Sequence, residues 1–165
     1  MPTSRLIRKS CFAALAVLVF AASAPASAKL RDGVVSLAVS LPLTGRFSSS
    51  GARLGAAYRF AAETLNEAGG VAVGRRDYQL SIEIRDDRSS VSGAAANAAA
   101  LAEEDFLLQL GGFGERAAIA GANAGAAGGA IVVSPLFASP SPPDGEEAER
   151  PRIFSIAPPR AAFFA

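Results

Sequence analysis

The chain has 165 residues, of which 50% are hydrophobic and 19% are charged, so it allows one domain at most and can bury a core. Its formal charge of +1 gives no reason to expect nucleic acid or an anionic membrane surface as a partner. There is no His and a single Cys, which excludes a Ser-His-Asp triad, an imidazole metal site and an internal disulfide. We therefore expect no cofactor and no bound metal.

Residues 1–28 have the pattern of a secretory signal peptide. Basic residues precede an apolar run of twelve, Cys11–Ala22, and an A-x-A sequence ends the segment at residues 26–28. A membrane span needs about 20 apolar residues, so an uncleaved anchor or a buried helix is the less favoured alternative. Cleavage after Ala28 would place residues 29–165 in the periplasm without stable membrane insertion.

The chain then alternates between strand and helix patterns. Val34–Leu41 is apolar, rich in β-branched residues and followed by a proline, which predicts a strand. A loop over Pro42–Gly51 comes next. Ala52–Ala68 has apolar residues at helical spacing before a Gly-Gly pair, which predicts an amphipathic helix. Tyr78–Arg85 alternates apolar and polar residues and predicts a half-buried strand near a sheet edge.

The same alternation continues toward the end of the chain. A turn over Asp86–Ser90 precedes a predicted helix, Val91–Glu104, and we expect an aspartate of that turn to cap it. Further elements are predicted over Phe106–Leu110, Arg116–Ala127, Ala130–Ser134 and Ile153–Ile156. The resulting order, β-α-β-α-β-α-β, predicts an α/β fold: a three-layer, Rossmann-like lobe with a mostly parallel sheet.

Two motifs raise the possibility of an enzyme. Residues 112–117 read G-x-G-x-x-A, as in a dinucleotide-binding turn, but no acidic residue occurs from Ala117 to Pro143, where the ribose partner should lie. Asp86-Asp87 could form a carboxylate pair for acid–base chemistry, although a helix cap is the favoured interpretation. An exported Rossmann-like nucleotide-binding enzyme therefore stays as an alternative, and we expect no catalytic residues.

In an open parallel sheet, ligands bind outside the carboxyl ends of the strands. Three predicted loops fall there: Pro42–Gly51, Gly111–Arg116 and Pro135–Ser139. Each joins a strand to small or hydroxylated residues and offers backbone N–H groups to a polar ligand. The sequence therefore predicts a small-molecule site at this edge.

The loops and their neighbours carry a series of family motifs. Leu41–Gly45 resembles LPLTG, Leu65–Val71 resembles IN-AGGV, and Asp86–Ser89 resembles DDqS. Leu110–Gly114 resembles iGPyg, and Ser134–Ser139 resembles SPsaas. In this order they resemble the type I periplasmic solute-binding proteins of the branched-chain amino acid transport family, which contain a leucine-binding protein domain. The resemblance covers almost the whole chain after the signal peptide.

This resemblance implies a non-enzymatic protein that captures a small solute, such as an amino acid or an amide, between two lobes. It also implies delivery of the solute to an inner-membrane ABC permease. Residues 29–165 would then be an incomplete N-terminal lobe, a truncated form of the family's domain. A fragment without function is the remaining alternative.

The resemblance also assigns ligand-binding residues to the three loops. They are Thr44, Ser50, Phe113, Gly114, Glu115, Leu136, Phe137, Ala138 and Ser139. The family has an aromatic residue at the position of Ser50, a serine at that of Glu115 and a threonine at that of Ala138. A carboxylate thus stands where an anion would bind. We hypothesise that a full-length protein with this lobe prefers a cationic or neutral ligand.

Overall fold

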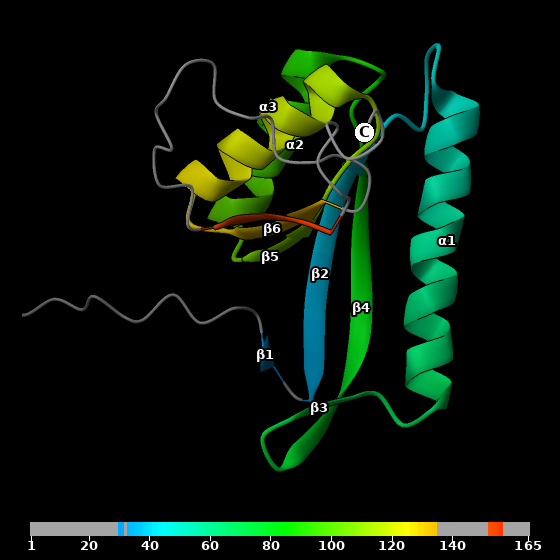
Figure 1. Cartoon of the computed structure of the whole chain (residues 1–165), viewed down its shortest axis with the longest axis vertical. Coiled ribbons are helices and arrows are strands. Elements are labelled where there is room, and N and C mark those ends of the chain that lie inside the picture. Colours follow the sequence, from blue (N-terminus) through cyan, green and yellow to red (C-terminus); the bar gives the residue numbers. More distant parts are fainter. Residues whose placement is uncertain (1–29, 32, 135–151, 157–165) are drawn as a thin grey trace, which may run out of the picture.

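The computed structural model describes residues 30–31, 33–134 and 152–156. The predicted signal peptide and the predicted Pro135–Ser139 loop lie outside these residues. The described residues form a seven-stranded sheet with helices on both sides (Figure 1). None of their helices is long and apolar enough to cross a membrane.

The centre of the sheet is parallel, as predicted. Strand β2 (Val34–Leu41) pairs with β4 (Arg76–Asp86) on one side and with β5 (Leu108–Leu110) on the other. The sheet continues from β5 through β6 (Ile131–Ser134) to β7 (Ile153–Ser155), again with parallel pairing. The carboxyl ends of these strands therefore meet at one edge of the sheet.

Two short strands were not predicted. β3 (Val71–Val73) pairs antiparallel with β4, and β1 (Leu30–Arg31) pairs antiparallel with β2. β3 lies at the outer edge of the sheet, so β4 is one strand from that edge and is near it, as expected. Strands of two or three residues are too short to show an alternating pattern, so they could not be predicted from periodicity.

The three helices of the described residues lie on both faces of the sheet. Helix α1 (Ser48–Glu67) lies on one side, and α2 (Val91–Glu103) and α3 (Glu115–Ala127) lie on the other (Figure 1). Contacts agree with this view: a Cβ on Gly55 of α1 would touch the side chains of Leu41 and Ile84. The fold is therefore the predicted three-layer α/β lobe.

Two predicted details of the helix starts are wrong. Helix α1 begins at Ser48 rather than at Ala52, so the loop after β2 spans residues 42–47. The first helical turn is closed by a hydrogen bond from Gly51 N to Phe47 O of 3.0 Å. Ser90, and not an aspartate, caps α2, because its Oγ accepts a hydrogen bond of 2.9 Å from Gly93 N. Both differences reflect serines, which favour helix N-termini as well as turns.

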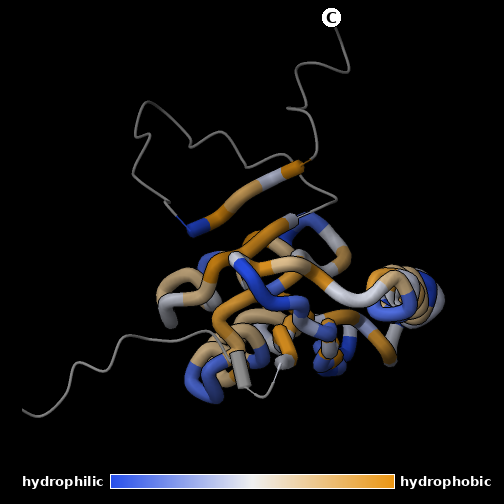
Figure 2. The backbone as a smooth tube through the Cα atoms, turned by 90° about the horizontal axis from the view of Figure 1, so that it is seen from below, coloured by the Kyte–Doolittle hydropathy of each residue, from blue (hydrophilic) through white to orange (hydrophobic). Residues whose placement is uncertain are grey.

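The buried core differs between the two faces. Larger aliphatic side chains such as Val39 and Leu41 of β2 are fully buried, whereas small residues form the contact between α2 and α3. Gly121 of α3, for instance, comes close to the backbone of Ala94 in α2. Hydrophobic stretches run through the strands, and hydrophilic residues concentrate in turns and outer helical surfaces (Figure 2). The N-termini of α2 and α3 lie at the same edge of the sheet because the two helices follow β4 and β5, which run parallel.

Candidate ligand-binding site

Turns after β2, β4 and β5 surround a hollow at the carboxyl edge of the sheet. Its volume is about 220 Å³. The residues that line it are Arg46, Phe47, Asp87, Ser89, Val91, Phe113, Gly114, Glu115, Arg116 and Ala117. Two of the three predicted ligand loops therefore come together here, with the turn after β4 between them.

Asp86 fixes the loop after β2. Its Oδ1 accepts hydrogen bonds from Leu43 N at 2.9 Å and from Thr44 N at 3.1 Å. Its Oδ2 accepts a bond of 2.6 Å from the Thr44 hydroxyl, and Arg88 N donates to Oδ1 at 2.8 Å. The Thr44 hydroxyl, followed by the backbone donors, lowers the pKa of Asp86. The Thr44 hydroxyl thus holds the protein's own loop.

Ser89 makes a second connection between the same two turns. Its hydroxyl donates to Thr44 O at 2.7 Å, and its Oγ accepts a hydrogen bond of 3.1 Å from Phe47 N. Arg88 and Ser89 both adopt positive φ, 56° and 58°, and this tight turn aims the Ser89 hydroxyl at the neighbouring loop. Sequence reasoning missed this role, although the spacing of Ser89 after the two aspartates could have indicated it.

An aromatic pair forms one wall of the hollow. The rings of Phe47 and Phe113 are 5.7 Å apart between centroids and inclined at 63°, an edge-to-face arrangement that is typical of stable pairs. The guanidinium carbon of Arg46 lies 4.3 Å from the centroid of the Phe47 ring. The Ser89 hydroxyl bonds to the backbone N–H of Phe47 and to Thr44 O. These two hydrogen bonds therefore also position the Phe47 ring in this wall.

Helix α3 begins at the hollow. Gly114 is its N-cap residue at φ 87°, a conformation that favours glycine, and no side chain caps the helix there. The helix dipole makes this end positive, and an acidic residue in the first turn stabilises it. Glu115 is that residue and is exposed. Helix stabilisation is therefore a physical reason for Glu115 that does not depend on a ligand.

Tyr58 connects α1 to the turn after β5. Its hydroxyl donates a hydrogen bond of 2.8 Å to Gly111 O. Burial raises the pKa of Tyr58 to about 12. The phenol therefore keeps its proton at neutral pH and holds the start of the glycine-rich turn.

Asp87 lies at the bottom of the site and differs from Asp86. It is 2% exposed, and its Oδ1 accepts a hydrogen bond of 2.7 Å from Ser89 N. Its Oδ2 has no hydrogen-bond partner among the residues that the structure describes. Burial is the main cause of a raised pKa for Asp87. The adjacent aspartates thus have opposite pKa shifts because one is surrounded by donors and the other is desolvated.

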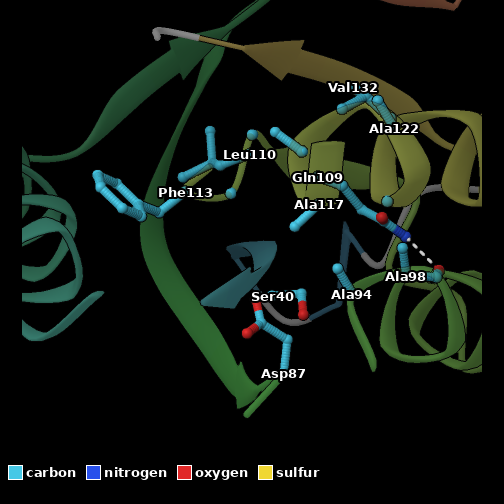
Figure 3. A pocket seen from close by; sticks show the side chains of 14 residues that line it. Ser40, Asp87, Ala94, Ala98, Gln109, Leu110, Phe113, Ala117, Ala122 and Val132 are labelled. Atoms are coloured by element: carbon cyan, nitrogen blue, oxygen red, sulfur yellow. Dashed lines mark hydrogen bonds between the residues drawn. The ribbon is translucent and has the colours of Figure 1, made fainter. Parts of the chain in front are cut away.

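A second, smaller hollow lies between Asp87 and the helix pair. Its volume is about 20 Å³, room for about one water molecule. Figure 3 shows Asp87 and Ser40 on one side of it, opposite Leu110 and Ala117. Phe113 lines both hollows, as Asp87 does. Asp87 therefore stands where the outer hollow meets the helix pair.

The predicted ligand residues fall into three groups. Phe113, Gly114 and Glu115 line the outer hollow. Thr44 lies beside it with its hydroxyl bonded to Asp86, and Ser50 lies within α1, outside the residues lining that hollow. The remaining four, Leu136–Ser139, lie outside the described residues. Within the described ranges, no group of three or more His, Cys, Asp or Glu residues could hold a metal ion.

A parallel α/β sheet with a hollow at the carboxyl ends of its strands is the arrangement of a ligand-binding lobe. Residues 34–162 match a family model described as "Periplasmic binding protein". The chain therefore belongs to the family of periplasmic binding proteins. No curated protein sequence matched the chain.

Solved structures have the same fold. The branched-chain amino acid transporter substrate-binding protein LivJ from Streptococcus pneumoniae, in complex with isoleucine, is 19% identical with a TM-score of 0.61 and covers 74% of this chain. An ABC-type branched-chain amino acid transporter from Rhodopseudomonas palustris is 18% identical with a TM-score of 0.57 over 75% of the chain. An ABC transporter substrate-binding protein from Desulfitobacterium hafniense, in complex with Leu, is 24% identical with a TM-score of 0.51 over 74%. The matched part is 33%, 32% and 33% of those chains, so this chain spans about a third of their length.

Proposed function

We propose that this chain supplies the ligand-capturing lobe of a solute-binding protein that delivers a small, amino-acid-like solute to an inner-membrane ABC permease. The observation that carries the proposal is the hollow where three turns converge, in a member of the periplasmic binding protein family. Two of the similar structures contain isoleucine or leucine, which supports a ligand of this size. The role is binding and involves no catalysis.

The size of the hollow supports a shared site. Pockets that enclose a drug-sized ligand usually measure about 300–1,000 Å³, more than the roughly 220 Å³ present here. One lobe would contribute one wall, and a second lobe would close over the solute by a hinge motion. The greater length of the similar structures supports such a partner lobe. Residues 1–28 would serve as a cleavable signal peptide that exports the protein to the periplasm.

Nuclear magnetic resonance titration tests ligand binding by this lobe. Isotope-labelled protein, purified after expression of the full chain, is titrated with leucine, isoleucine and glutamine. We expect backbone amide shifts to concentrate at Phe113, Gly114 and Glu115. Phe113→Ala should weaken binding by about tenfold, because it removes buried ligand contact of about 1.4 kcal/mol.

Phe60→Ala is the matched control, because Phe60 is 70% exposed on α1 and does not line the hollow. Equal losses in the two variants, or shifts spread evenly over the chain, would contradict the proposed site. Cell fractionation and the intact mass of the recovered protein test export. A product that retains residues 1–28 in the cytoplasm would argue against the signal peptide.

A further inference from the structure

One carboxylate oxygen in the site is unused. Asp87 is 2% exposed, and its Oδ2 has no hydrogen-bond partner among the described residues. Buried carboxylates are normally paired or hydrogen-bonded, since water no longer solvates them. Ion pairs join Arg85 to Glu83 and to Glu104, and neither of them involves Asp87.

The unused oxygen itself is buried, so a ligand reaches it only when the Asp87 side chain turns. Asp87 lines the outer hollow of about 220 Å³ and also the small hollow behind it. Figure 3 shows its carboxylate beside Ser40 and facing the space bounded by Phe113 and Ala117. Ser40 Oγ already accepts a hydrogen bond of 3.0 Å from Asn97, so its hydroxyl proton can serve one further acceptor. Asp87 Oδ2 is therefore an unpaired acceptor at the base of the site.

The walls of the outer hollow also suit a cation. Aromatic ring faces attract ammonium and guanidinium groups. The Arg46 guanidinium already lies 4.3 Å from the centroid of the Phe47 ring, and Phe113 lines the hollow beside it. Glu115 adds a second carboxylate at the entrance. Arg46 and Arg116 also line the hollow. Like Glu115 they are exposed, so water and salt screen the charges of all three side chains, whereas Asp87 is buried.

We infer that Asp87 is a recognition residue for the cationic end of the solute, so that the site takes ligands with a primary ammonium or guanidinium group. The cation enters past the aromatic pair, and the Asp87 side chain turns its Oδ2 from the buried position into the outer hollow to pair with it. Asp86 cannot serve in the same way, because its two oxygens already accept four hydrogen bonds from the protein. This inference rests on the proposed function and names the class of solute.

Three small probes of similar shape test the inference: n-butylammonium, butyramide and butyrate. Each is titrated into the purified protein while backbone amides and the side-chain carboxyl carbon of Asp87 are followed by NMR. We expect n-butylammonium to bind at least tenfold more tightly than butyramide and to shift the signal of the Asp87 carboxyl carbon. Asp87→Asn should remove the preference.

Asp77→Asn is the matched control, because it removes one exposed carboxylate from the opposite end of β4. It should leave the preference for n-butylammonium unchanged. Equal affinity for n-butylammonium and butyramide, or a preference that survives Asp87→Asn, would overturn the inference. So would an Asp87 signal that does not respond in the unmodified protein, a readout that does not require the variant to fold. Leucine binding at Phe113–Glu115 with no response at Asp87 would remove the inference and leave the proposed function in place.

Discussion

Gly51 and Gly55 offer a matched test of how α1 is held against the sheet. A Cβ on Gly51 would lie 2.1 Å from Pro42 O, a backbone atom that cannot move without displacing the end of β2. A Cβ on Gly55 would lie 3.4 Å from the terminal methyl groups of Leu41 and Ile84, which is ordinary contact. Both substitutions to Ala gain about 1 kcal/mol of helix propensity. Overpacking costs about 1–3 kcal/mol and applies to Gly51 alone.

We therefore expect Gly51→Ala to lower the free energy of unfolding by up to about 2 kcal/mol, and Gly55→Ala to raise it by up to about 1 kcal/mol. Urea unfolding followed by circular dichroism measures both values. Since Gly51 N bonds to Phe47 O, Gly51→Ala should also shift the NMR signals of Phe47 and its partner Phe113. Equal stability of the two variants would refute the argument that backbone contact places α1.

Further variants test individual contacts. Ser90→Ala should lower the free energy of unfolding by about 1 kcal/mol, because α2 loses its cap. Leu101→Ala should lower it by about 2–5 kcal/mol, because a fully buried side chain is removed. Urea unfolding measures both values. Tyr58→Phe should cost about 0.5–1.5 kcal/mol and should eliminate the phenol that titrates near pH 12, as followed by ultraviolet absorbance. Asp86, with a lowered pKa, stabilises the fold above the unfolded pKa of 3.8, and this contribution is lost as the pH falls through the folded pKa. The raised pKa of Asp87 has the opposite effect on stability. Its stabilising contribution is present below pH 3.8 and is lost as the pH rises through the folded pKa. Asp87→Asn should therefore flatten that part of the plot of unfolding free energy against pH, as measured by urea unfolding.

Most of the fold could be predicted because its elements have strong periodic patterns. The predicted bounds of Val34–Leu41 are confirmed to the residue, and Tyr78–Arg85 differs from β4 by two residues at one end and one at the other. The start of α1 could not be predicted in the same way. Its serines are equally compatible with a turn, and the choice depends on tertiary contact between Gly51 and Pro42.

The candidate site was less predictable than the fold. Family motifs led to Phe113–Glu115, which line the hollow, because a turn of this kind opens a helix. Thr44 also carries a motif, yet its hydroxyl bonds to Asp86 across 42 residues of sequence. Local patterns carry no information about such a partner. The same holds for Ser89, whose hydroxyl joins the loop after β2 to the turn after β4.

The pair Asp86-Asp87 shows why neighbouring residues of one type can have separate roles. Successive side chains at a strand end point to opposite faces of the sheet. Asp86, the last residue of β4, meets the N–H groups of the loop after β2 and is saturated by them. Asp87, one residue further, is directed toward the small hollow below the helix pair and keeps one oxygen unused. The first carboxylate therefore builds the loop that carries Phe47, and the second is buried beneath that loop with one oxygen unpaired.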